Sequence, residues 1–574
     1  MSNELLLKYN KILKKKYGYE TLKPEQFNII DKIVNDRKDI LGILATGFGK
    51  SICYQMPYLI TKKCVIVVSP LIALMTDQMT ELKKLKIPVT VLNSTCKNKE
   101  EITDEILAGN NMVIYITPEY MEHCEAFLKM LVENDQLALI AIDEAHCVST
   151  WGLDFRKSYT LLKNIRDWID SSVPILALTA TASKKVQKDI IKILQLEDAE
   201  TIIGDFDRKN LYISVKKRSK DPHDDLFELL NKYKDDYKIV YCKTREETEK
   251  ISEIITNFGF SCLPYHAGLN SKKRDEIQKK FIDGDIKTMV ATIAFGMGIN
   301  IKSVRLVIHY NCPKNVESYY QEIGRAGRDG LASECHLFYS KKDFIINKLF
   351  LDSIKDPKHK AYQEEQINNI EKYVYSAKCR RLSILKSFDD KYDKAECSNC
   401  DNCNKVVNKV EENKKDYSIA AFLILDLINK LNGSYGINTY INILRGSKAK
   451  NITQYMQNLA FYNIGKNYSV EWFKDIFNAL TCDEYLMETP IKFSMGAIVG
   501  CTKKAKDWIN NIKSNYESIK SFNCEINIKK EDKLLLTESK IMKNINSIGK
   551  SKIKDDVFND DVLKRFNIDI DLDD

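Results

Sequence analysis

Residues 40–56, ILGILATGFGKSICYQM, join an apolar run to a helix-like run through a loop that holds two glycines and a lysine. A strand, a glycine loop and a helix in this order are the context of a phosphate-binding loop, whose backbone N–H groups surround the phosphates. Lys50 would reach the β- and γ-phosphates, and the hydroxyl of Ser51 would hold Mg²⁺. The match is partial, because Leu44 stands where the strict pattern has glycine. The alternative is an ordinary strand-to-helix turn with a surface lysine.

A second apolar run, LALIAI at residues 137–142, ends in the acidic pair Asp143 and Glu144, with His146 close behind. A run this apolar predicts a buried parallel strand, and open α/β sheets bind ligands beyond the carboxyl ends of such strands. Asp143 would hold Mg²⁺, and Glu144 would orient and deprotonate an attacking water, a role worth roughly 10²–10⁴-fold in rate. His146 could link the nucleotide site to whatever the protein moves. The alternative is a charged strand end that caps a helix.

A third segment, YYQEIGRAGRDG at residues 319–330, sets Arg325 and Arg328 three residues apart among glycines. Both guanidinium groups could point at one anionic centre, and glycine lets the backbone approach a phosphate closely. Gln321 would position the water or the γ-phosphate. A phosphate-binding lysine, an acidic metal-binding pair and an arginine pair are together the parts of an NTP-driven machine with an arginine finger.

Four cysteines form a further cluster: Cys379 lies upstream of Cys397, Cys400 and Cys403, which follow C-x₂-C-x₂-C spacing. Four thiolates suit a tetrahedral zinc site, and an iron–sulfur cluster also uses four cysteines. The chain has 16 cysteines, most of them scattered singly through apolar segments. That distribution favours free thiols over disulfides and predicts an intracellular, reducing compartment, without separating nucleus from cytoplasm.

Length and composition bound the class of protein. A chain of 574 residues predicts three to four domains, since one domain takes about 150 residues. The formal net charge of +8 is compatible with phosphate contacts but does not prove them. The N-terminus shows no signal-peptide pattern, and no apolar run approaches membrane-spanning length. We therefore expect no membrane partner, and protein partners are not readable from the sequence.

The motifs and their order resemble those of RecQ-family DNA helicases of superfamily 2, and the resemblance runs from about Tyr17 to about Ile512. No single stretch is conclusive, but the ordered set is very specific. Besides the segments above, the similar stretches are YGY at 17–19, LKPEQ at 22–26, VVSPLIALMTDQ at 67–78, ALTATA at 177–182, IVYCKTR at 239–245, YHAGL at 265–269 and VATIAFGMGIN at 290–300.

This resemblance implies roles for individual residues. Gln26 would read the adenine base, although the family usually has arginine where Lys23 stands, which weakens bidentate contact there. Arg328 would be the finger on the γ-phosphate, with Arg325 assisting, and the four cysteines would bind structural Zn²⁺. The nucleotide contacts would come from Tyr19, Lys23, Gln26, Thr46, Gly47, Phe48, Gly49, Lys50 and Ser51.

The loop CVSTWGLDFR, residues 147–156, follows the acidic pair directly. Aromatic and guanidinium faces stack on unpaired bases for roughly 1–3 kcal/mol each, so Trp151, Phe155 and Arg156 could sense single-stranded DNA and report to Glu144. The resemblance supports this role, but the family usually has glutamine and histidine where Thr150 and Leu153 stand. The alternative is a Trp and a Phe that pack in the core.

The alternation of apolar runs and helical stretches predicts an α/β fold with parallel sheets. In the first lobe, strands are expected near residues 40–44, 65–69, 113–117, 137–142 and 175–179. The resemblance implies two RecA-like lobes, then a helical Cys₄ zinc-binding domain and a winged-helix domain. The expected boundaries are 1–210 and 211–340 for the lobes, 341–410 for the zinc domain, 411–519 for the winged helix and 520–574 for a disordered tail.

The resemblance implies contacts with DNA from three further residues: Arg245 in the second lobe, and Arg445 and Ser447 in the winged helix. A basic loop at a helix end grips duplex phosphates. Residues 485–491 and 493–499 could pair as a short wing, too short for a large strand-separating pin. The alternatives are a helical scaffold without DNA contact and, for the acidic tail, a partner-docking peptide.

Taken together, the residues and the resemblance predict an ATP-dependent DNA helicase that uses ATP, Mg²⁺ and Zn²⁺. The resemblance implies 3′ to 5′ movement on single-stranded DNA, separation of duplex or forked DNA, and a role in repair, recombination or replication. Two alternatives stay open at this point. One is an RNA helicase, and the other is a non-motor module that binds DNA junctions and uses ATP as a switch.

Overall fold

The structure is a computed structural model that describes residues 2–94, 96, 98–151, 156–295, 301, 303–376, 378–388, 396–407, 414–490, 497–520 and 535–537. The chain forms two compact units. Met1–Tyr373 and Cys379–Cys403 make up the first, and Val374–Lys378 and Asn404–Asp574 make up the second.

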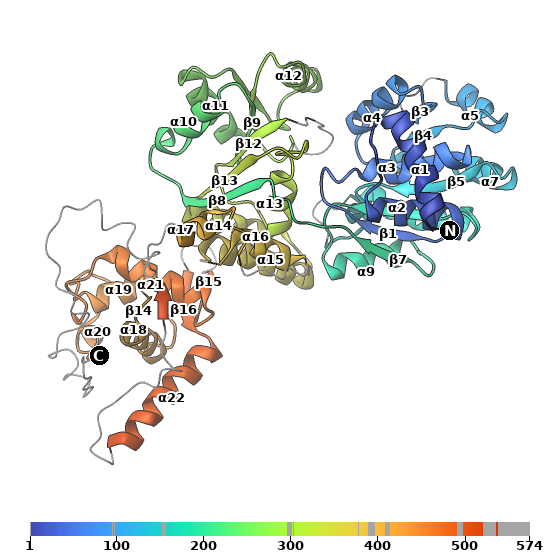
Figure 1. The fold of residues 1–574 in the computed structure, drawn as a ribbon. Coiled ribbons are helices and arrows are strands. Elements are labelled where there is room, and N and C mark those ends of the chain that lie inside the picture. The colour runs from blue at the N-terminus through green and yellow to red at the C-terminus, as the bar shows by residue number, and fades with distance from the viewer. Residues whose placement is uncertain are drawn as a thin grey trace. The chain divides into compact units, whose positions relative to one another are not determined.

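The first lobe is built on a parallel sheet with the strand order β3-β4-β2-β5-β6-β1-β7 (Figure 1). Its strands are β1 Ile40–Ile43, β2 Cys64–Val68, β3 Val89–Leu92, β4 Val113–Ile116, β5 Leu137–Ile142, β6 Ile175–Thr179 and β7 Glu200–Ile203. Strands β1, β2, β4, β5 and β6 are buried along their whole length. These are the five strands expected from the apolar runs, with ends that differ by at most one residue.

Two strands of this sheet, β3 and β7, were not predicted. Both lie at the edges of the sheet and are partly exposed. Edge strands need to be apolar on one side only, so their short mixed sequences carry no continuous apolar run. The helices of the lobe are α1 Ser2–Tyr17, α2 Pro24–Asp31, α3 Lys50–Thr61, α4 Ile72–Lys84, α5 Lys99–Leu107, α6 Pro118–Met121, α7 Glu125–Glu133, α8 Ile165–Trp168 and α9 Lys184–Ile193, with shorter turns at Lys32–Asp36, Ala145–Val148 and Lys157–Asn164.

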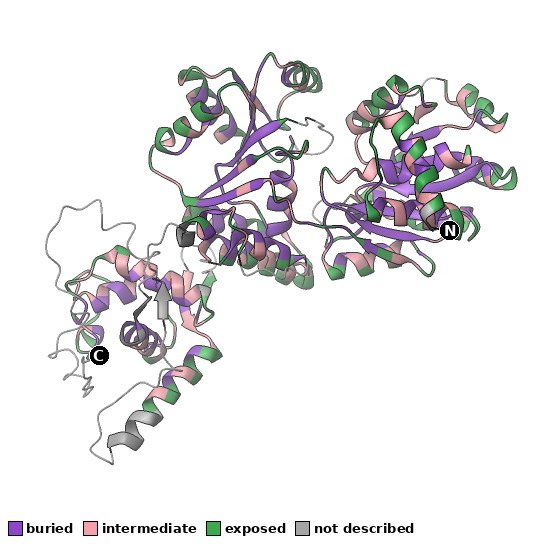
Figure 2. Ribbon diagram, in the orientation of Figure 1, coloured by how far each residue is buried: buried purple, intermediate pink, exposed green. Residues whose placement is uncertain are grey.

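The second lobe repeats the plan with the parallel strand order β10-β11-β9-β12-β13-β8. Figure 2 shows the interior strands of both sheets buried and their covering helices exposed on the outer side. The strands are β8 Leu211–Lys217, β9 Tyr237–Tyr241, β10 Cys262–Tyr265, β11 Thr288–Ala291, β12 Val304–His309 and β13 Ser333–Tyr339, and the helices are α10 Pro222–Lys232, α11 Arg245–Asn257, α12 Ser271–Asp283 and α13 Val316–Ile323.

A helical module follows the second lobe and belongs to the same compact unit over Cys379–Cys403. Cys400 forms an isolated parallel bridge with Ile213 of β8, and the carboxylate of Asp401 accepts a hydrogen bond from the backbone of Val215 at 3.4 Å. The module is therefore tied to the edge of the second sheet. Its elements are α14 Lys341–Leu349, a 3₁₀ turn at Phe350–Ser353, α15 Pro357–Tyr375, α16 Arg380–Ser387 and α17 Asp401–Val407.

The second unit holds a helical core and an antiparallel hairpin. Helix α18 is almost wholly apolar and packs with α19, α21 and the hairpin in one buried cluster. The hairpin pairs Leu486 with Cys501 and Pro490 with Ala497, while residues 491–496 lie outside the described part of the chain. The elements are α18 Ser418–Lys430, α19 Ile437–Leu444, α20 Gln454–Gln457, α21 Val470–Cys482, β15 Leu486–Pro490, β16 Ala497–Cys501 and α22 Lys503–Lys520.

The segment after residue 520 is described only at β17 Leu535–Thr537, which pairs antiparallel with β14 Lys414–Asp416. The rest of the expected disordered tail lies outside the described residues. Among the residues that the structure describes, no helix is both long and apolar enough to cross a membrane.

Candidate nucleotide site, zinc centre and nucleic-acid contacts

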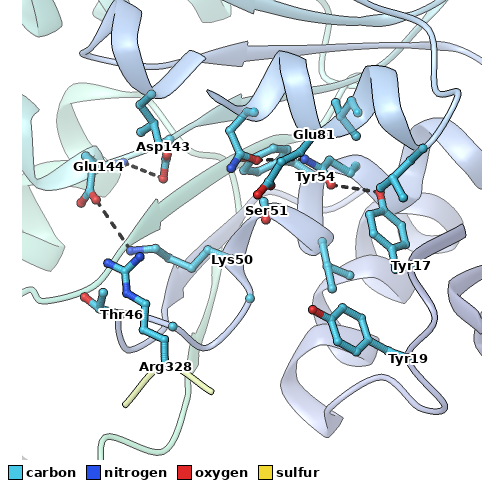
Figure 3. Close-up of a pocket in the computed structure, with 18 of the residues that line it drawn as sticks. Tyr17, Tyr19, Thr46, Lys50, Ser51, Tyr54, Glu81, Asp143, Glu144 and Arg328 are labelled. Atoms are coloured by element: carbon cyan, nitrogen blue, oxygen red, sulfur yellow. Dashed lines mark hydrogen bonds and ion pairs between the residues drawn. The ribbon is translucent and has the colours of Figure 1, made fainter. Parts of the chain in front are cut away.

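A cavity of about 550 Å³ brings the three nucleotide motifs together (Figure 3). The phosphate loop between β1 and α3 lines it on one side, and the acidic pair after β5 and the arginine segment after α13 line it on the others. This volume lies within the range of ordinary small-molecule sites. The predicted residues that line the cavity are Tyr19, Thr46, Gly47, Gly49, Lys50, Ser51, Asp143, Glu144, Gln321, Arg325 and Arg328.

The phosphate loop takes the conformation that its glycines allow. Gly47 and Gly49 have φ of +80° and +94°, in the left-handed region where only glycine is unstrained. A Cβ atom at Gly49 would lie 2.6 Å from Nε2 of Gln26. Leu44, which departs from the strict pattern, is fully buried and donates its backbone N–H to Thr179 at 2.9 Å, so it simply extends β1.

The predicted adenine-reading segment contacts the phosphate loop itself. Gln26 Nε2 donates to the carbonyl oxygens of Phe48 at 3.1 Å and Gly49 at 3.2 Å. Lys23 Nζ donates to the same Phe48 carbonyl at 3.1 Å and lies 3.9 Å from the Phe48 ring centroid. Tyr19 is half exposed beside them. Lys23, Gln26 and Phe48 therefore support the phosphate loop. None of these three residues lines the cavity.

Lys50 and Glu144 face each other across the cavity. Lys50 Nζ lies 3.8 Å from Glu144 Oε1, and both side chains are about 15% exposed. Burial alone would raise the pKa of Glu144, but the positive charges of Lys50, His146 and Arg325 outweigh it and hold the pKa below its ordinary value. Glu144 is thus an ionised carboxylate, the form that a general base requires.

Asp143 is buried directly beside this carboxylate. Burial and then the negative charge of Glu144 raise the pKa of Asp143 to about 6, and this clustering of negative charge favours a cation at the site. His146 is almost fully buried, with Nδ1 at 2.9 Å from Thr179 Oγ1 and 3.3 Å from Glu144 Oε2. Because Thr179 ends β6 and lies within the ALTATA segment at 177–182, His146 joins the acidic pair to that segment.

The arginine segment of the second lobe packs directly on the phosphate loop. A Cβ atom at Gly47 would lie 3.4 Å from Cγ of Arg328, and one at Gly324 would lie 3.2 Å from Cβ of Thr46. Burial, and then the charges of Arg325 and Arg208, lower the pKa of Arg328 to about 9. Two buried guanidinium groups that repel each other would be stabilised by a polyphosphate anion between them and Lys50.

Several residues of this site were not predicted from the sequence. Gln78 and Glu81 of α4 line the cavity, and Tyr17 donates from its hydroxyl to Gln55 at 2.9 Å on the same wall. Arg208, in the linker between the lobes, donates to backbone carbonyls of both lobes. Gln78 and Tyr17 lie in stretches that resemble the family, which was an available signal. Arg208 carries no such signal, since a lone arginine in a polar linker is ordinary.

The four predicted metal ligands form one cluster. The Sγ atoms of Cys379, Cys397, Cys400 and Cys403 all lie within 4.8 Å of one another, and those of Cys397 and Cys403 are 3.9 Å apart. Ligands about 2.3 Å from a tetrahedral zinc ion would have sulfur atoms roughly 3.8 Å apart. Backbone N–H groups donate to three of the sulfurs at 3.4 Å, as suits thiolates. The cluster fits zinc.

The aromatic loop is described only at its two ends, and Phe155 lies outside the described residues. Trp151 is half-buried, with its ring 5.2 Å from Tyr362 and 5.4 Å from His359 of α15. Lys185 Nζ of α9 lies 2.9 Å from the Trp151 ring centroid. Arg156 donates to the Pro70 carbonyl at 2.8 Å, which ties the loop to the family-like stretch at residues 67–78.

The other predicted DNA contacts lie in separate parts of the chain. Arg245 is exposed at the start of α11, and a Cβ atom at Gly268 would lie 3.1 Å from its Cδ, so two predicted motifs of the second lobe meet there. Arg445 is the cap residue directly after α19 in the second unit. Tyr462 donates to the carbonyls of Gly446 at 3.0 Å and Ser447 at 3.3 Å, which holds that loop in place.

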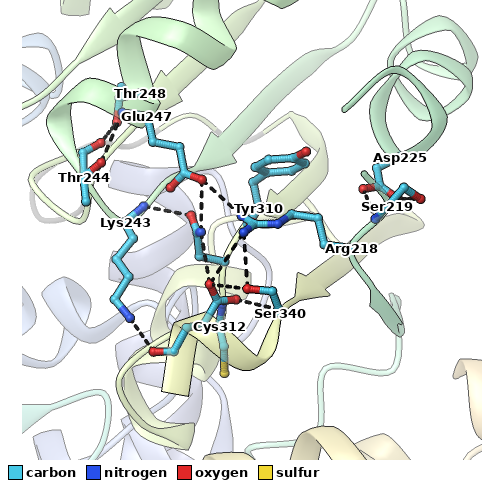
Figure 4. Close-up of polar contacts among 12 residues, drawn as sticks. Arg218, Ser219, Asp225, Lys243, Thr244, Glu247, Thr248, Tyr310, Cys312 and Ser340 are labelled. Atoms are coloured by element: carbon cyan, nitrogen blue, oxygen red, sulfur yellow. Dashed lines mark hydrogen bonds and ion pairs between the residues drawn. The ribbon is translucent and has the colours of Figure 1, made fainter. Parts of the chain in front are cut away.

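A polar network anchors the segment that carries Arg245 (Figure 4). Arg218 donates to Glu247 at 3.1 Å and to the hydroxyl of Ser340 at 3.2 Å. Lys243 Nζ donates to the backbone carbonyl of Asp343 at 2.7 Å, and burial lowers the pKa of Lys243 to about 8. The start of α14 is therefore tied to the Lys243–Arg245 segment of the second lobe.

Four family profiles match successive parts of the chain. They are the DEAD/DEAH box helicase at residues 23–190, the helicase conserved C-terminal domain at 222–330, RecQ zinc-binding at 341–404 and the RQC domain at 411–520. The order is that of the two lobes, the helical module with its four cysteines, and the second unit.

Curated relatives cover most of the chain. A protein of Acanthamoeba polyphaga mimivirus, provisionally named an ATP-dependent RNA helicase, is 42% identical over 88% of this chain and 92% of its own length. The bifunctional 3′-5′ exonuclease/ATP-dependent helicase WRN of Mus musculus is 36% identical over 88% of this chain, which spans only 37% of that protein. The ATP-dependent DNA helicase RecQ of Haemophilus influenzae is 35% identical over 82% of this chain and 74% of its own length.

Among solved structures, the DEAD-box helicase Mss116 bound to single-stranded RNA and UDP-BeF superposes with a TM-score of 0.50 at 16% identity, over 68% of this chain and 86% of that one. A likeness at that identity shows the two-lobed fold alone. The identity of 35% along 74% of a bacterial RecQ protein goes further, and with matching zinc-binding and RQC domains it shows that the chain belongs to the RecQ family of ATP-dependent helicases.

Proposed function

We propose that this protein hydrolyses ATP to move 3′ to 5′ along single-stranded DNA and to separate duplex or forked DNA in genome maintenance. The observation that carries the proposal is the single cavity lined by Lys50, Glu144 and Arg328, which come from both lobes. A site made from two lobes changes when the lobes move, so hydrolysis there can be coupled to movement along a strand.

The residues of the cavity divide the chemistry among them. Lys50 binds the β- and γ-phosphates in place of its contact with Glu144, which frees that carboxylate to accept a proton from the attacking water. Arg328, with Arg325 beside it, stabilises the charge that develops on the transferred phosphoryl group. Gln321 positions the water or the γ-phosphate. Buried His146 relays the state of Glu144 to Thr179.

We include Mg²⁺ in this proposal because its expected ligands, Ser51 and Asp143, line the same cavity. A hydroxyl and a carboxylate are the oxygen ligands that Mg²⁺ prefers, usually together with phosphate oxygens and water. When bound, the ion would neutralise part of the negative charge on the phosphates. The buried position of Asp143 next to Glu144 supports a cation there.

The DNA-binding side of the proposal rests on exposed or half-exposed groups that the nucleotide site does not use. Trp151 lies within the aromatic loop that follows the acidic pair, Arg156 ends that loop, and Arg245 lies on the second lobe. Arg445 and Ser447 would grip duplex phosphates. The bacterial relatives named as DNA helicases support DNA as the substrate, and the zinc centre would hold the helical module in shape.

We also propose boundaries for the four domains and a cellular location for the protein. The matched profiles support a first lobe at residues 1–210, a second at 211–340, a zinc module at 341–410 and a winged helix at 411–519. The free cysteines among the described residues, most of them buried, support a reducing intracellular compartment.

A strand-displacement assay on forked DNA and forked RNA, with and without ATP, tests the proposal. We expect ATP-dependent displacement of DNA forks with a 3′ single-stranded tail, none with a 5′ tail alone, and none by Lys50→Ala. The name of the mimivirus relative favours an RNA helicase as the second candidate, and displacement of RNA but not DNA would establish it. ATP-dependent DNA binding with no displacement of either would establish the switch alternative.

A further inference from the structure

Arg208 lies in the linker that joins the two lobes, between β7 and β8. It is not among the residues that line the nucleotide cavity. Its side chain is instead inserted between the phosphate loop of the first lobe and the arginine segment of the second lobe. A side chain at this place can report the separation of the two lobes directly to both.

The guanidinium group of Arg208 binds both sides of the cleft. Nη1 donates to the carbonyl oxygen of Thr46 in the phosphate loop at 3.0 Å. Nη2 donates to the carbonyl oxygens of Ala326 at 2.8 Å and Gly327 at 2.9 Å, between the two predicted finger arginines. The planar, forked geometry of arginine suits this bridge, because its donors point in fixed and divergent directions.

The hydrogen bonds of Arg208 are linked to the reacting groups through the neighbouring residues on each side of the cleft. Thr46 precedes Gly47, against which the stem of Arg328 packs. Ala326 and Gly327 are the two residues that separate Arg325 from Arg328. One side chain therefore sets the distance between the backbone that surrounds the phosphates and the backbone that carries the finger.

The linker that carries Arg208 is itself held from behind by the zinc module. Arg381, two residues after the zinc ligand Cys379, donates to the carbonyl of Arg208 at 2.5 Å and to the carboxylate of Asp207 at 2.9 Å. Asn399, which lies between two further cysteine ligands, donates to the carbonyls of Lys209 at 3.0 Å and Leu211 at 3.2 Å. The backbone of Arg208 is thus fixed while its side chain spans the cleft.

We propose that Arg208 is a positioning residue for ATP hydrolysis, which clamps the phosphate loop to the arginine segment and is held in place by Arg381. This inference rests on the proposed function and deepens it. In the closed cleft the clamp aligns Arg328 with the phosphoryl group, and opening of the cleft must break its bonds to one lobe. The clamp acts through backbone carbonyls, so it affects alignment in the transition state more than ground-state binding of ATP.

The expected consequence is a selective loss of turnover. A displacement of about 1 Å at a reacting group can cost about 10²-fold in rate, so Arg208→Ala should lower DNA-stimulated kcat by about tenfold to a hundredfold. The Kd for ATP should change by less than about threefold. Arg208→Lys keeps the charge but has one ammonium in place of the fork, so it should recover only part of the rate.

The experiment measures three quantities on the full chain: the Kd for ATP, single-turnover hydrolysis, and the Kd for ADP with aluminium fluoride, which mimics the transferring phosphoryl group. Arg208→Ala should weaken the mimic by the same factor by which it slows hydrolysis. Arg381→Gln should give a smaller loss with its zinc content retained, and the double variant should lose less than the product of the two factors, because both act on one clamp.

Arg166→Lys is the matched control. Arg166, like Arg208, donates to backbone carbonyls, and it is buried and paired with the carboxylate of Asp39, but it lies within the first lobe, away from the cleft. The Arg166→Lys substitution should lower thermal stability and leave kcat per folded molecule unchanged. Unchanged turnover and mimic binding in Arg208→Ala would overturn the clamp, and so would equal losses in ATP affinity and rate. A wild-type protein without ATPase activity would instead refute the proposed function.

Discussion

Replacing Glu144 by glutamine should make ATP bind more tightly and react more slowly. Lys50 Nζ lies 3.8 Å from Glu144 Oε1, with both side chains largely buried. The phosphates of ATP must take Lys50 from this carboxylate and must also approach its negative charge. Glu144→Gln keeps the size of the side chain and removes both obstacles, but it also removes the proton acceptor.

The size of the two effects follows from the geometry. Two unit charges 3.8 Å apart attract by about 4 kcal/mol at an effective dielectric constant of about 20, which is an upper bound on what ATP must overcome. Solvent and the neighbouring cations offset most of this attraction. We therefore expect Glu144→Gln to improve the free energy of ATP binding by about 1–2 kcal/mol, which is about five- to thirtyfold tighter binding. Loss of a general base should lower kcat by about 10²–10⁴-fold, which raises the barrier by about 3–5 kcal/mol.

The assay is equilibrium binding of ATP in the presence of Mg²⁺, followed by single-turnover hydrolysis of the bound nucleotide. Glu144→Asp is the matched control, because it retains the charge and shortens the reach. It should leave ATP affinity close to that of the wild type and still slow the reaction. The opposite sign of the two effects in Glu144→Gln is the decisive feature.

Two outcomes would contradict this reasoning. If Glu144→Gln hydrolyses ATP at the normal rate, Glu144 is not the base and the site assignment is wrong. If the variant loses affinity in step with rate, the carboxylate supports nucleotide binding, and the contact with Lys50 does not compete with the phosphates.

Three further predictions concern other parts of the molecule. Arg328→Ala should lower turnover by about 10³-fold or more and ATP affinity far less, and Arg325→Ala should have a smaller effect. Separate measurement of Kd and kcat tests this prediction. If both variants lose only affinity, the two arginines act in ground-state binding of ATP. Trp151→Ala should leave ATP binding nearly intact but weaken the stimulation of hydrolysis by single-stranded DNA, whereas unchanged stimulation would mean that the tryptophan only packs against α15. Purified protein should contain about one zinc ion per chain. The Cys400→Ser variant should lose this ion and become protease-sensitive between residues 341 and 410, because structural zinc contributes roughly 10–16 kcal/mol of apparent binding energy. Iron at the site, or a well-folded protein without metal, would refute the assignment.

Local sequence was enough to predict the central strands and the main charged groups of the cavity. The five fully buried strands of the first sheet are continuous apolar runs, and burial on both faces leaves that mark in the sequence wherever it occurs. The edge strands β3 and β7 escaped because one exposed side permits polar residues. Lys50, Glu144 and the pair of Arg325 and Arg328 could be named because phosphate and water chemistry restricts which side chains can do the work, while the choice of Arg328 as the finger came from the family resemblance.

The functions of side chains that bridge distant segments depended on the tertiary structure. Nothing local distinguishes Arg208 from other linker arginines, and its bonds to Thr46 and Ala326 exist only because the chain path brings two lobes together. The packing of Trp151 against His359 and Tyr362 is of the same kind. Apolar periodicity and motif chemistry are properties of neighbouring residues, so the sequence alone determined the elements and the reactive groups. Contacts between segments far apart in the chain are set by the joint packing of all elements, so only the folded structure decided which groups meet across the cleft.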